Sequence, residues 1–459
     1  MLVRRNAAHG ERTRSFPVAQ TSGPRRVKIA PAMKLRISVA RVALLVIVTA
    51  VLVLFGVNLV SSPEKQITRE FPHLYGTDDP QFLRSMGVLL GPALVGGNKV
   101  DTLLNGEQIF PAMLDAIRSA KKTITFETYI YWSGNVGRAF ANAISERAKA
   151  GVKVHVLIDW IGSQKMEKQL IDEMKDAGVE IEKYHPLAWY TLDRLNNRTH
   201  RKLLVVDGLV GFTGGVGIAD EWDGHAQDRD HWRDTHYRIE GPAVAQMQAA
   251  FLDNWTKVSG VVLHGDAYFP PQRERGDLHA QVFKSSVDGG AESTHLMYLL
   301  SIAAATKSID LEMAYFVPDA LTLAMLDAAM KRRVKVRIIM PGPITDASLV
   351  RRASRSTWGQ ILQAGAEIYE FQPTMFHCKV LVIDGVWTSV GSTNFDNRSF
   401  RLNDEANLNI YDRAFAQAQI AVFEADRARS RRITFADWAS RPWTERAWEK
   451  FLGLFGAQL

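Results

Sequence analysis

A polar triplet occurs twice in this 459-residue chain, each time at the start of an apolar run. "THRKLLVVDG" begins at Thr199 and "FHCKVLVIDG" begins at Phe376, and both read His-x-Lys, then four residues, then Asp. A lysine beside an imidazole on a buried strand costs free energy unless something pairs with it. One such histidine is commonly a core residue satisfied by backbone groups, but two matched pairs in equivalent places indicate a functional site.

The chain around these triplets also repeats. "KKTITFETYIYW" (Lys121–Trp132) is echoed by "TKSIDLEMAYFVPD" (Thr306–Asp319), and each is predicted to form a strand. Matching helices are expected over Gly137–Lys149 and Ala320–Lys331, and matching strands over Gly151–Asp159, Arg333–Pro341, Val179–Lys183 and Ala366–Phe371. Strands that alternate with helices predict an α/β fold with two similar domains, each a mainly parallel sheet flanked by helices.

The net charge of +7 is concentrated at the N-terminus, where residues 1–41 carry +9 and leave −2 for the rest of the chain. The nineteen residues from Val42 to Val60 carry no charge, and a membrane-spanning helix needs about 20 apolar residues. A buried core helix would rarely follow so basic a tail, and a cleaved signal usually has a shorter apolar region of about 7–15 residues. We therefore predict a transmembrane helix, with the tail cytoplasmic and the body extracytoplasmic.

These patterns divide the chain into seven predicted parts. They are a basic tail (1–41), a transmembrane helix (42–60), a linker (61–95), a first domain (96–260), a second linker (261–280), a second domain (281–430) and a C-terminal amphipathic tail (431–459). Cys378 is the only cysteine in the sequence, so no internal disulfide is possible.

The paired triplets suit the chemistry of a phosphodiester. Two lysines supply positive charge for the phosphate oxygens, one imidazole can attack phosphorus, and the other can protonate the leaving alcohol. Gly215, Ser392 and Asn394 follow the triplets and are candidate phosphate ligands, through close backbone approach or hydrogen bonds. The sequence offers no His, Cys, Asp and Glu spacing typical of a metal site, and we predict no metal and no cofactor.

The chain resembles the phospholipase D superfamily, and more narrowly the bacterial cardiolipin synthases, over residues 96–459. The stretches that carry this resemblance are "RLNNRTHRKLLVVDG", "GGVGIADEW", "HWRDTH", "YFVPD", "SRSTWG" and "GSTNFDNRSF". The resemblance implies that both triplets form one active site. The candidate catalytic residues are His200, Lys202, Asp207, His377, Lys379 and Asp384.

The resemblance also implies a role for each residue. His200 is expected to be the nucleophile and His377 the acid and base, with Glu405 supporting His200 and Asp234 supporting His377. Lys202, Lys379 and Asn394 are expected to bind phosphate, while Asp207 and Asp384 orient their own motifs. The family usually has an asparagine where this chain has Gly217, so one phosphate hydrogen bond is missing or comes from the backbone.

A membrane lipid fits the remaining features. Trp189 and Tyr190 are candidates for the mouth of a lipid site. A C-terminal helix is expected to carry an aromatic side that either packs on the domain or lies in a membrane interface; its residues are Trp443, Trp448, Phe451, Leu452 and Phe455.

The predicted activity is the transfer of a phosphatidyl group from one phosphatidylglycerol to another in a bacterial inner membrane, which gives cardiolipin. One alternative is a hydrolase with the same chemistry, either a phospholipase D or another phosphodiesterase. A second alternative is a non-catalytic lipid-binding protein. The acidic body argues against a nucleic-acid substrate. The sequence leaves open the donor lipid, the choice between water and an alcohol as acceptor, and the oligomeric state.

Overall fold

The computed structural model describes residues 42–49, 53, 67–186, 197–286 and 293–453. The chain divides into two units, Met1–Val53 and Leu54–Leu459. Residues 42–49 are helical, but most of the predicted basic tail and much of the predicted membrane helix lie outside the described ranges. Within those ranges, no helix has the length and apolar character that crossing a bilayer requires. The membrane helix therefore stays a prediction.

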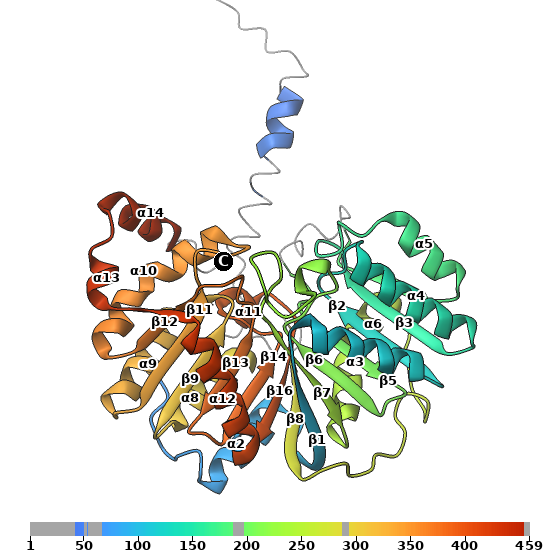
Figure 1. Ribbon diagram of the computed structural model, residues 1–459, viewed down its shortest axis with the longest axis horizontal. Helices are drawn as coiled ribbons and strands as arrows, with labels where there is room; N and C mark the ends of the chain where they lie inside the picture. Colours follow the sequence, from blue (N-terminus) through green and yellow to red (C-terminus); the bar gives the residue numbers. More distant parts are fainter. Residues whose placement is uncertain (1–41, 50–52, 54–66, 187–196, 287–292, 454–459) are drawn as a thin grey trace, which may run out of the picture. The chain divides into compact units, whose positions relative to one another are not determined.

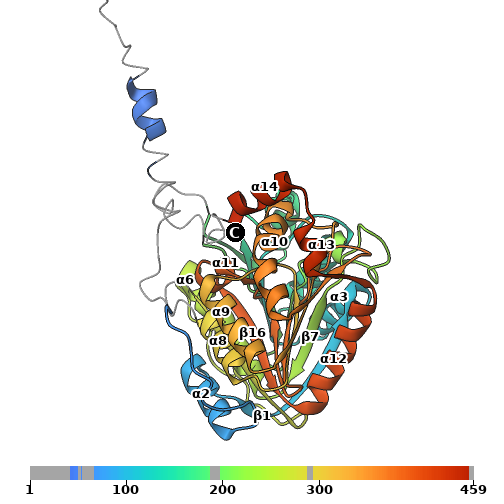
Figure 2. The same cartoon turned by 90° about the vertical axis from the view of Figure 1, so that its left-hand side faces the viewer.

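The second unit is built on one fifteen-stranded sheet with helices on both faces (Figures 1 and 2). The strand order is β17-β12-β11-β9-β13-β14-β16-β8-β1-β7-β6-β5-β2-β3-β4. The strands of the first half are β1 (Val95–Leu104), β2 (Thr123–Thr128), β3 (Lys153–Asp159), β4 (Glu180–Tyr184), β5 (Leu203–Val206), β6 (Val210–Gly214) and β7 (Thr235–Glu240). Those of the second half are β8 (Leu278–Ser285), β9 (Ser308–Met313), β11 (Lys335–Pro341), β12 (Glu367–Phe371), β13 (Lys379–Ile383), β14 (Trp387–Gly391), β16 (Glu405–Tyr411) and β17 (Ser430–Ile433). The order of the two halves is mirrored about the β1–β8 pair, as a repeat predicts.

The helices follow the same repeat. They are α2 (Pro80–Leu90), α3 (Asn105–Ser119), α4 (Asn135–Lys149), α5 (Lys168–Asp176), η2 (Asp220–Trp222), α6 (Ala243–Ser259), α8 (Ser293–Ala304), α9 (Ala320–Lys331), α10 (Ser348–Ala364), α11 (Asn397–Arg401), α12 (Arg413–Ala428), α13 (Phe435–Ala439) and α14 (Trp443–Gly453). Figure 2 shows α8 and α9 on one side of the sheet and α3 and α12 on the other. A two-stranded sheet pairs β10 (Phe316–Val317) with β15 (Phe395–Asp396).

The prediction of a mainly parallel sheet was wrong, because the sheet is mixed. Only β2-β3-β4 and β9-β11-β12 are parallel runs, and the strands that join the two runs pair antiparallel. The reason is a tight turn directly after each triplet. Asp207-Gly208 and Asp384-Gly385 all have positive φ, as in the primed turns of β-hairpins. Val206 pairs with Val210 and Ile383 pairs with Trp387, so each connection is three residues long. Each turn sends the chain back beside the strand that it has just left.

The aspartates of the two triplets stand at these turns. The carboxylate of Asp207 accepts the backbone N–H groups of Lys121, Lys122 and Thr123, just before and at the start of β2. Asp384 does the same for Thr306, Lys307 and Ser308 at the start of β9. Both aspartates therefore fix the register of their motif strand from the end of the strand opposite to the histidine.

Each half has its own apolar core, and a further cluster joins the two halves. One cluster packs the β2 and β3 side chains against α3 and α4, and another packs β9 and β11 against α8 to α10. A third cluster joins the centre of the sheet, where Val100 and Tyr237 of the first half lie in one cluster with Val282 and Leu408 of the second. The two halves are thus held together by buried apolar surface as well as by strand pairing.

Candidate active site

Residues of both halves line one pocket of about 630 Å³. Its lining includes His200 and Lys202 of the first triplet, and His377 of the second, together with Asn394. Two motifs about 180 residues apart in sequence are therefore brought to a common cavity, as the sequence predicted. The motif histidines lie just before β5 and β13, in segments outside the regular strands.

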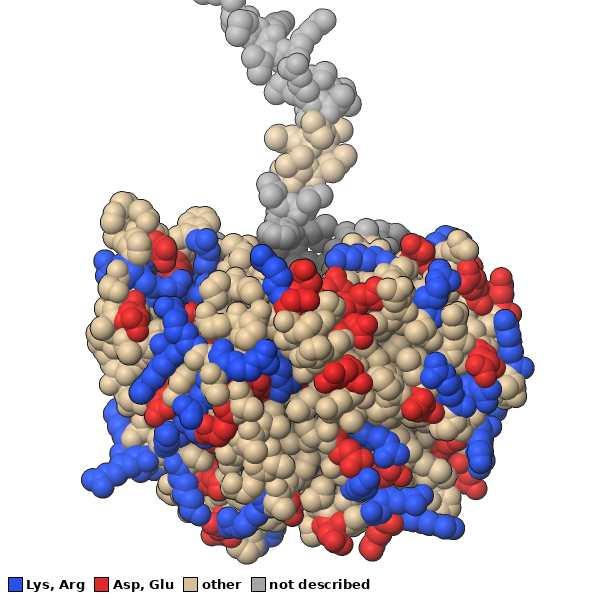
Figure 3. All heavy atoms as spheres, viewed as in Figure 1, with Lys and Arg blue, Asp and Glu red and all other residues tan. Residues whose placement is uncertain are grey.

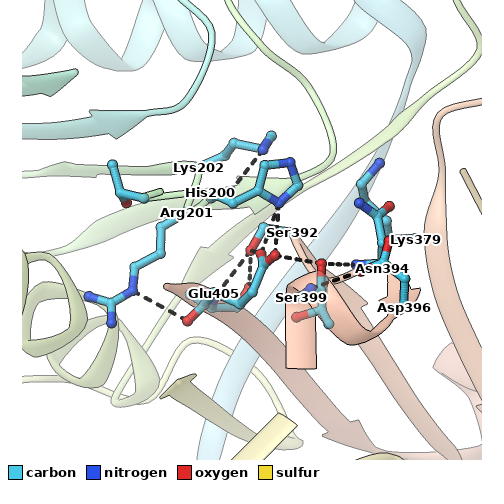
Figure 4. A network of polar contacts seen from close by, with 12 residues as sticks. His200, Arg201, Lys202, Lys379, Ser392, Asn394, Asp396, Ser399 and Glu405 are labelled. Carbon is cyan, nitrogen blue, oxygen red and sulfur yellow. Dashed lines mark hydrogen bonds and ion pairs between the residues drawn. The ribbon is translucent and has the colours of Figure 1, made fainter. Parts of the chain in front are cut away.

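His200 is held by a carboxylate from the opposite half of the chain. Its Nδ1 lies 2.9 and 3.0 Å from the two carboxylate oxygens of Glu405, a residue at the start of β16. The hydroxyls of Ser392 and Ser399 donate to the same carboxylate at 2.5 and 2.7 Å (Figure 4). A carboxylate so anchored fixes Nδ1 as the protonated nitrogen and leaves Nε2 of His200 for chemistry.

His377 has the reciprocal arrangement. Its Nδ1 lies 2.8 Å from the Asp234 carboxylate of the first half, which also accepts the indole N–H of Trp222 at 2.9 Å. The rings of Trp222 and Trp232 pack beside the imidazole, with centroids 5.3 and 5.5 Å away. The pairings expected from the family resemblance, Glu405 with His200 and Asp234 with His377, are therefore both present.

Short backbone bridges between the halves lock these pairs in place. The His200 N–H donates to the Asp404 carbonyl at 2.9 Å, and the His377 N–H donates to the Arg233 carbonyl at 2.8 Å. Asp404 and Arg233 each directly precede a supporting carboxylate. Each histidine is thus tied through its backbone and through its ring to one segment of the other half.

The two lysines lie against their own histidines. Lys202 Nζ donates to the His200 carbonyl at 2.8 Å, and Lys379 Nζ donates to the His377 carbonyl at 2.6 Å. Lys379 Nζ also lies 3.2 Å from both ring nitrogens of His377. Positive charge is therefore concentrated between the two imidazoles, where a phosphate anion would be stabilised.

Of the three predicted phosphate ligands, only Asn394 lines the pocket. Ser392 instead donates to Glu405, so it acts on phosphate only through the His200 support. A Cβ on Gly215 would lie 2.2 Å from a carboxylate oxygen of Asp234, so this glycine makes room for the support of His377. At Gly217 a Cβ would lie 2.9 Å from Ile130 and 3.1 Å from Trp222, so those side chains occupy the space that an asparagine would need.

Several pocket residues were not found from the sequence. Tyr129 and Tyr315 follow the equivalent strands β2 and β9 by one and two residues. Arg198 directly precedes the first motif segment, and Arg398 lies on α11. The Tyr315 hydroxyl donates to Asp346 at 2.5 Å. Their position after these strands was a usable signal for the tyrosines, because α/β sheets bind ligands at the carboxyl ends of their parallel strands. Trp189 and Tyr190, predicted at the pocket mouth, lie outside the described residues.

The chain matches the family described as "Cardiolipin synthase, PLD-like domain" over residues 113–253 and 298–427. It is 35% identical over 348 residues to the major cardiolipin synthase of Bacillus subtilis, covering 75% of this chain and 72% of that protein. It is 34% identical over 352 residues to cardiolipin synthase A of Pseudomonas fluorescens, covering 76% of this chain and 73% of that protein.

The chain belongs to the cardiolipin synthase family of phospholipase D-like proteins. It is a phospholipase D-type phosphatidyltransferase, as predicted. The crystal structure of phosphatidylserine synthase from Haemophilus influenzae has the same fold, with a TM-score of 0.65 at 14% identity, and covers 83% of this chain and 100% of that one.

The electrostatics of this cardiolipin synthase family site favour a neutral nucleophile. Burial lowers the pKa of His200 to about 4, although the Glu405 carboxylate opposes the shift. Burial and the charge of Lys379 also lower the pKa of His377. Burial lowers the pKa of Lys202 to about 7. A bound phosphodiester anion would raise the pKa of the lysine and of the acid, because it stabilises their charged forms.

We expect these pKa values to appear in the pH dependence of activity. His200 must be neutral to attack, so its protonation should reduce kcat/KM only as the pH falls towards about 4. Lys202 and His377 must be charged. Because the pKa of His377 is lowered from its usual value, kcat/KM should begin to fall, as the pH rises, before about pH 6.5 and should fall further as the pH passes about 7, where Lys202 loses its proton. The alkaline limb of kcat should lie at higher pH than the alkaline limb of kcat/KM, because the bound phosphodiester raises the pKa values of Lys202 and His377. Initial rates from pH 4 to 9 test this, and an acidic limb near 6.5 would contradict it.

A buried acidic group lies behind His377 in this family member. Ligand atoms of Glu312, Cys378 and Asp426 lie within 4.8 Å of one another. The Arg233 guanidinium donates to Asp426 at 2.7 Å, and burial raises the pKa of Glu312 well above its usual range. This group therefore already holds a cation, the guanidinium of Arg233, and we assign it a structural role.

Proposed function

We propose that the protein makes cardiolipin and glycerol from two molecules of phosphatidylglycerol, through a phosphatidyl-histidine intermediate. The observation that carries the proposal is one pocket with two imidazoles, each supported by a carboxylate on Nδ1. A binding protein would need neither the second imidazole nor its support. The relatives named cardiolipin synthase supply the substrate class.

The proposed reaction has two steps. In the first, Nε2 of His200 attacks phosphorus, the bond to the glycerol oxygen breaks, and His377 gives that oxygen its proton. In the second, the primary hydroxyl of another phosphatidylglycerol loses its proton to His377 and attacks phosphorus, and the bond from phosphorus to His200 breaks. Lys202, Lys379 and Asn394 bind the phosphate oxygens in both steps.

The test is incubation of the purified full chain with labelled phosphatidylglycerol in mixed micelles, followed by lipid analysis. We expect labelled cardiolipin and an equal amount of released glycerol, with no cleavage of DNA. Phosphatidic acid as the only product would favour the hydrolase alternative. If the protein binds the lipid but forms neither cardiolipin nor phosphatidic acid, the result would favour a binding protein. On the face in Figure 3, Lys and Arg are interspersed with Asp and Glu, which does not favour nucleic acid.

We further propose a single-pass protein of a bacterial inner membrane, with the helix at 42–60 and the body outside the cytoplasm. The charge of +9 on residues 1–41 supports this orientation. On α14, Trp443, Trp448 and Phe451 are 73%, 47% and 48% exposed while Leu452 is buried, which suits a helix that packs on the body and touches a membrane interface. Phe455 lies outside the described residues.

The expected topology can be measured with reporters fused after Leu459. A reporter that works only outside the cytoplasm should be active, and one that works only inside should be inactive. The matched control is the same fusion with residues 1–60 replaced by a cleavable secretion signal, which should also export the reporter. Activity of the cytoplasmic reporter alone would contradict the proposed orientation.

A further inference from the structure

The side of the pocket beside His377 is lined by aromatic rings. The rings of Trp222 and Trp232 pack against the imidazole, and the ring of Tyr315 lies edge-on to it with centroids 6.4 Å apart. In the proposed first step, His377 protonates the glycerol oxygen that leaves phosphorus. The headgroup of the donor lipid therefore lies on this side of the pocket, against these rings.

Asp346 adds a carboxylate to the same side of the pocket. It is exposed between β11 and α10, and its Oδ2 accepts the Tyr315 hydroxyl at 2.5 Å. Its charge opposes the lowering of the pKa of His377 and of Lys379 by burial, so the carboxylate lies within electrostatic reach of both. Among the residues that the structure describes, Tyr315 is the only hydrogen-bond partner of this carboxylate, so Oδ1 is left to accept from a ligand.

Two other carboxylates line the pocket, and neither is placed in this way. Asp396 caps α11 by accepting the Ser399 N–H, and burial raises its pKa to about 7. Glu221 lies on η2, and within the described part of the chain its side chain has no hydrogen-bond partner that would hold it in one position. Asp346 is therefore the pocket carboxylate that is both held by a neighbour and open to a ligand.

The charges around Asp346 favour a neutral partner over a cationic one. A carboxylate oxygen can accept a hydrogen bond from a hydroxyl or from an ammonium group. Lys379 Nζ lies 3.2 Å from both ring nitrogens of His377, and Lys165, whose Nζ lies 3.5 Å from the centre of the Trp132 ring, also lines the pocket. These cations would repel an ammonium headgroup but not a hydroxyl, so the site suits a neutral polyol such as glycerol.

We propose that Asp346 is a specificity-determining residue, whose free carboxylate oxygen accepts a hydrogen bond from a free hydroxyl of the headgroup glycerol. This inference rests on the proposed function, since it takes His377 as the acid and phosphatidylglycerol as the donor. Tyr315 is a positioning residue that orients the carboxylate. The acceptor glycerol occupies the same place in the second step, because its attacking oxygen replaces the leaving oxygen beside His377. Asp346 changes no bond.

The experiment compares two donors that differ in their headgroup hydroxyls. Purified full chain receives trace acyl-labelled phosphatidylglycerol or phosphatidylpropanol, whose headgroup has no free hydroxyl, in micelles with excess ethanol. The rate at which phosphatidylethanol and phosphatidic acid form gives kcat/KM for each donor. In Asp346→Ala we expect the ratio of kcat/KM for phosphatidylglycerol to that for phosphatidylpropanol to fall by about tenfold to a hundredfold, the effect of losing a hydrogen bond to a charged group. Asp346→Asn should retain part of the ratio, because its amide oxygen still accepts.

The matched control is Asp327→Ala, which removes a carboxylate that pairs with Lys331 and does not line the pocket. Its donor ratio should equal that of wild type. The rate with phosphatidylpropanol reports folding and the action of His377 in each variant, so a poorly folded variant cannot imitate the result.

Three outcomes would overturn the proposal. An equal fall with both donors in Asp346→Ala would assign the carboxylate to the electrostatics of His377. Loss of the donor preference in Glu221→Gln, but not in Asp346→Ala, would move the headgroup contact to the other carboxylate. Preference of wild type for phosphatidylethanolamine, lost in Asp346→Ala, would replace the hydroxyl by an ammonium group. The proposed function fails separately, if wild type with excess phosphatidylglycerol and no ethanol makes no cardiolipin, and that result leaves the donor ratios unchanged.

Discussion

His200→Ala is expected to abolish formation of the covalent lipid adduct with every donor and to reduce transfer on the order of 10³-fold or more. In the proposed mechanism this side chain supplies the attacking nitrogen, which the methyl group of alanine cannot replace. Intact-protein mass spectrometry after rapid quenching measures the adduct directly. A phosphodiester with a nitrophenol leaving group serves as the activated donor.

His377→Ala should behave differently with the same donor. It lacks the acid but keeps the nucleophile and its support by Glu405. Since nitrophenolate leaves without protonation, the adduct should form and then persist, because no base activates the acceptor. With phosphatidylglycerol as donor, this variant should be nearly inactive.

His225→Ala is the control for these variants, because this side chain is 62% exposed and outside the pocket. Its adduct formation and transfer rate should match those of wild type, and EDTA should change none of the results. An adduct on His200→Ala but not on His377→Ala would reverse the assignment. The absence of any adduct, even on wild type, would favour direct attack by the acceptor.

Asp426→Ala is expected to destabilise the fold by about 3–5 kcal/mol, since it leaves a buried guanidinium without its carboxylate. Arg233 donates to both oxygens of Asp426, at 3.1 and 2.7 Å, and the two side chains are only 4% and 5% exposed. The Arg233 carbonyl also accepts the His377 N–H, so activity should fall along with stability. Urea unfolding of the full chain in detergent measures the loss.

Asp327→Ala provides the comparison for an exposed pair. Asp327 lies 2.6 Å from Lys331, which is 76% exposed, so its removal should cost less than about 1 kcal/mol. Glu312 is close enough to Arg233 to ionise when Asp426 is gone, and Glu312→Gln in the same chain should therefore increase the loss. If Asp426→Ala and Asp327→Ala lower the free energy of unfolding by the same amount, the result would contradict a structural role for the buried ion pair.

The repeat was predictable because each half carries its own periodic strands and helices. The expected strand over Gly151–Asp159 is β3, and the expected helix over Ala320–Lys331 is α9. The antiparallel strands were missed although a signal was present. Asp-Gly between two apolar runs is typical of a hairpin, and the aspartate that ends each triplet is followed by glycine. The predicted limits of the two domains stay predictions.

The residues of the site also divide into those that the sequence predicts and those that it does not. The triplets stand out by spacing, whereas Tyr129, Arg198 and Arg398 occupy positions that no spacing rule marks. The sequence predicts Ser392 and Gly215 as phosphate ligands because small residues favour close approach. Their actual role depends on Glu405, at the start of β16, and on Asp234, directly before β7. Contacts that are made only after the sheet has formed cannot be read from local sequence.

The exchange of carboxylates between the halves has an evolutionary consequence. Each half holds the support of the other half's imidazole, so loss of either support impairs chemistry across the whole pocket. Two copies of the first half would pair two histidines with two short aspartates and would lack any counterpart of Asn394, since Gly217 has no room for one. After such divergence the halves are no longer interchangeable. Under the proposed mechanism the two halves are then specialised, with the nucleophile in one half and the acid in the other.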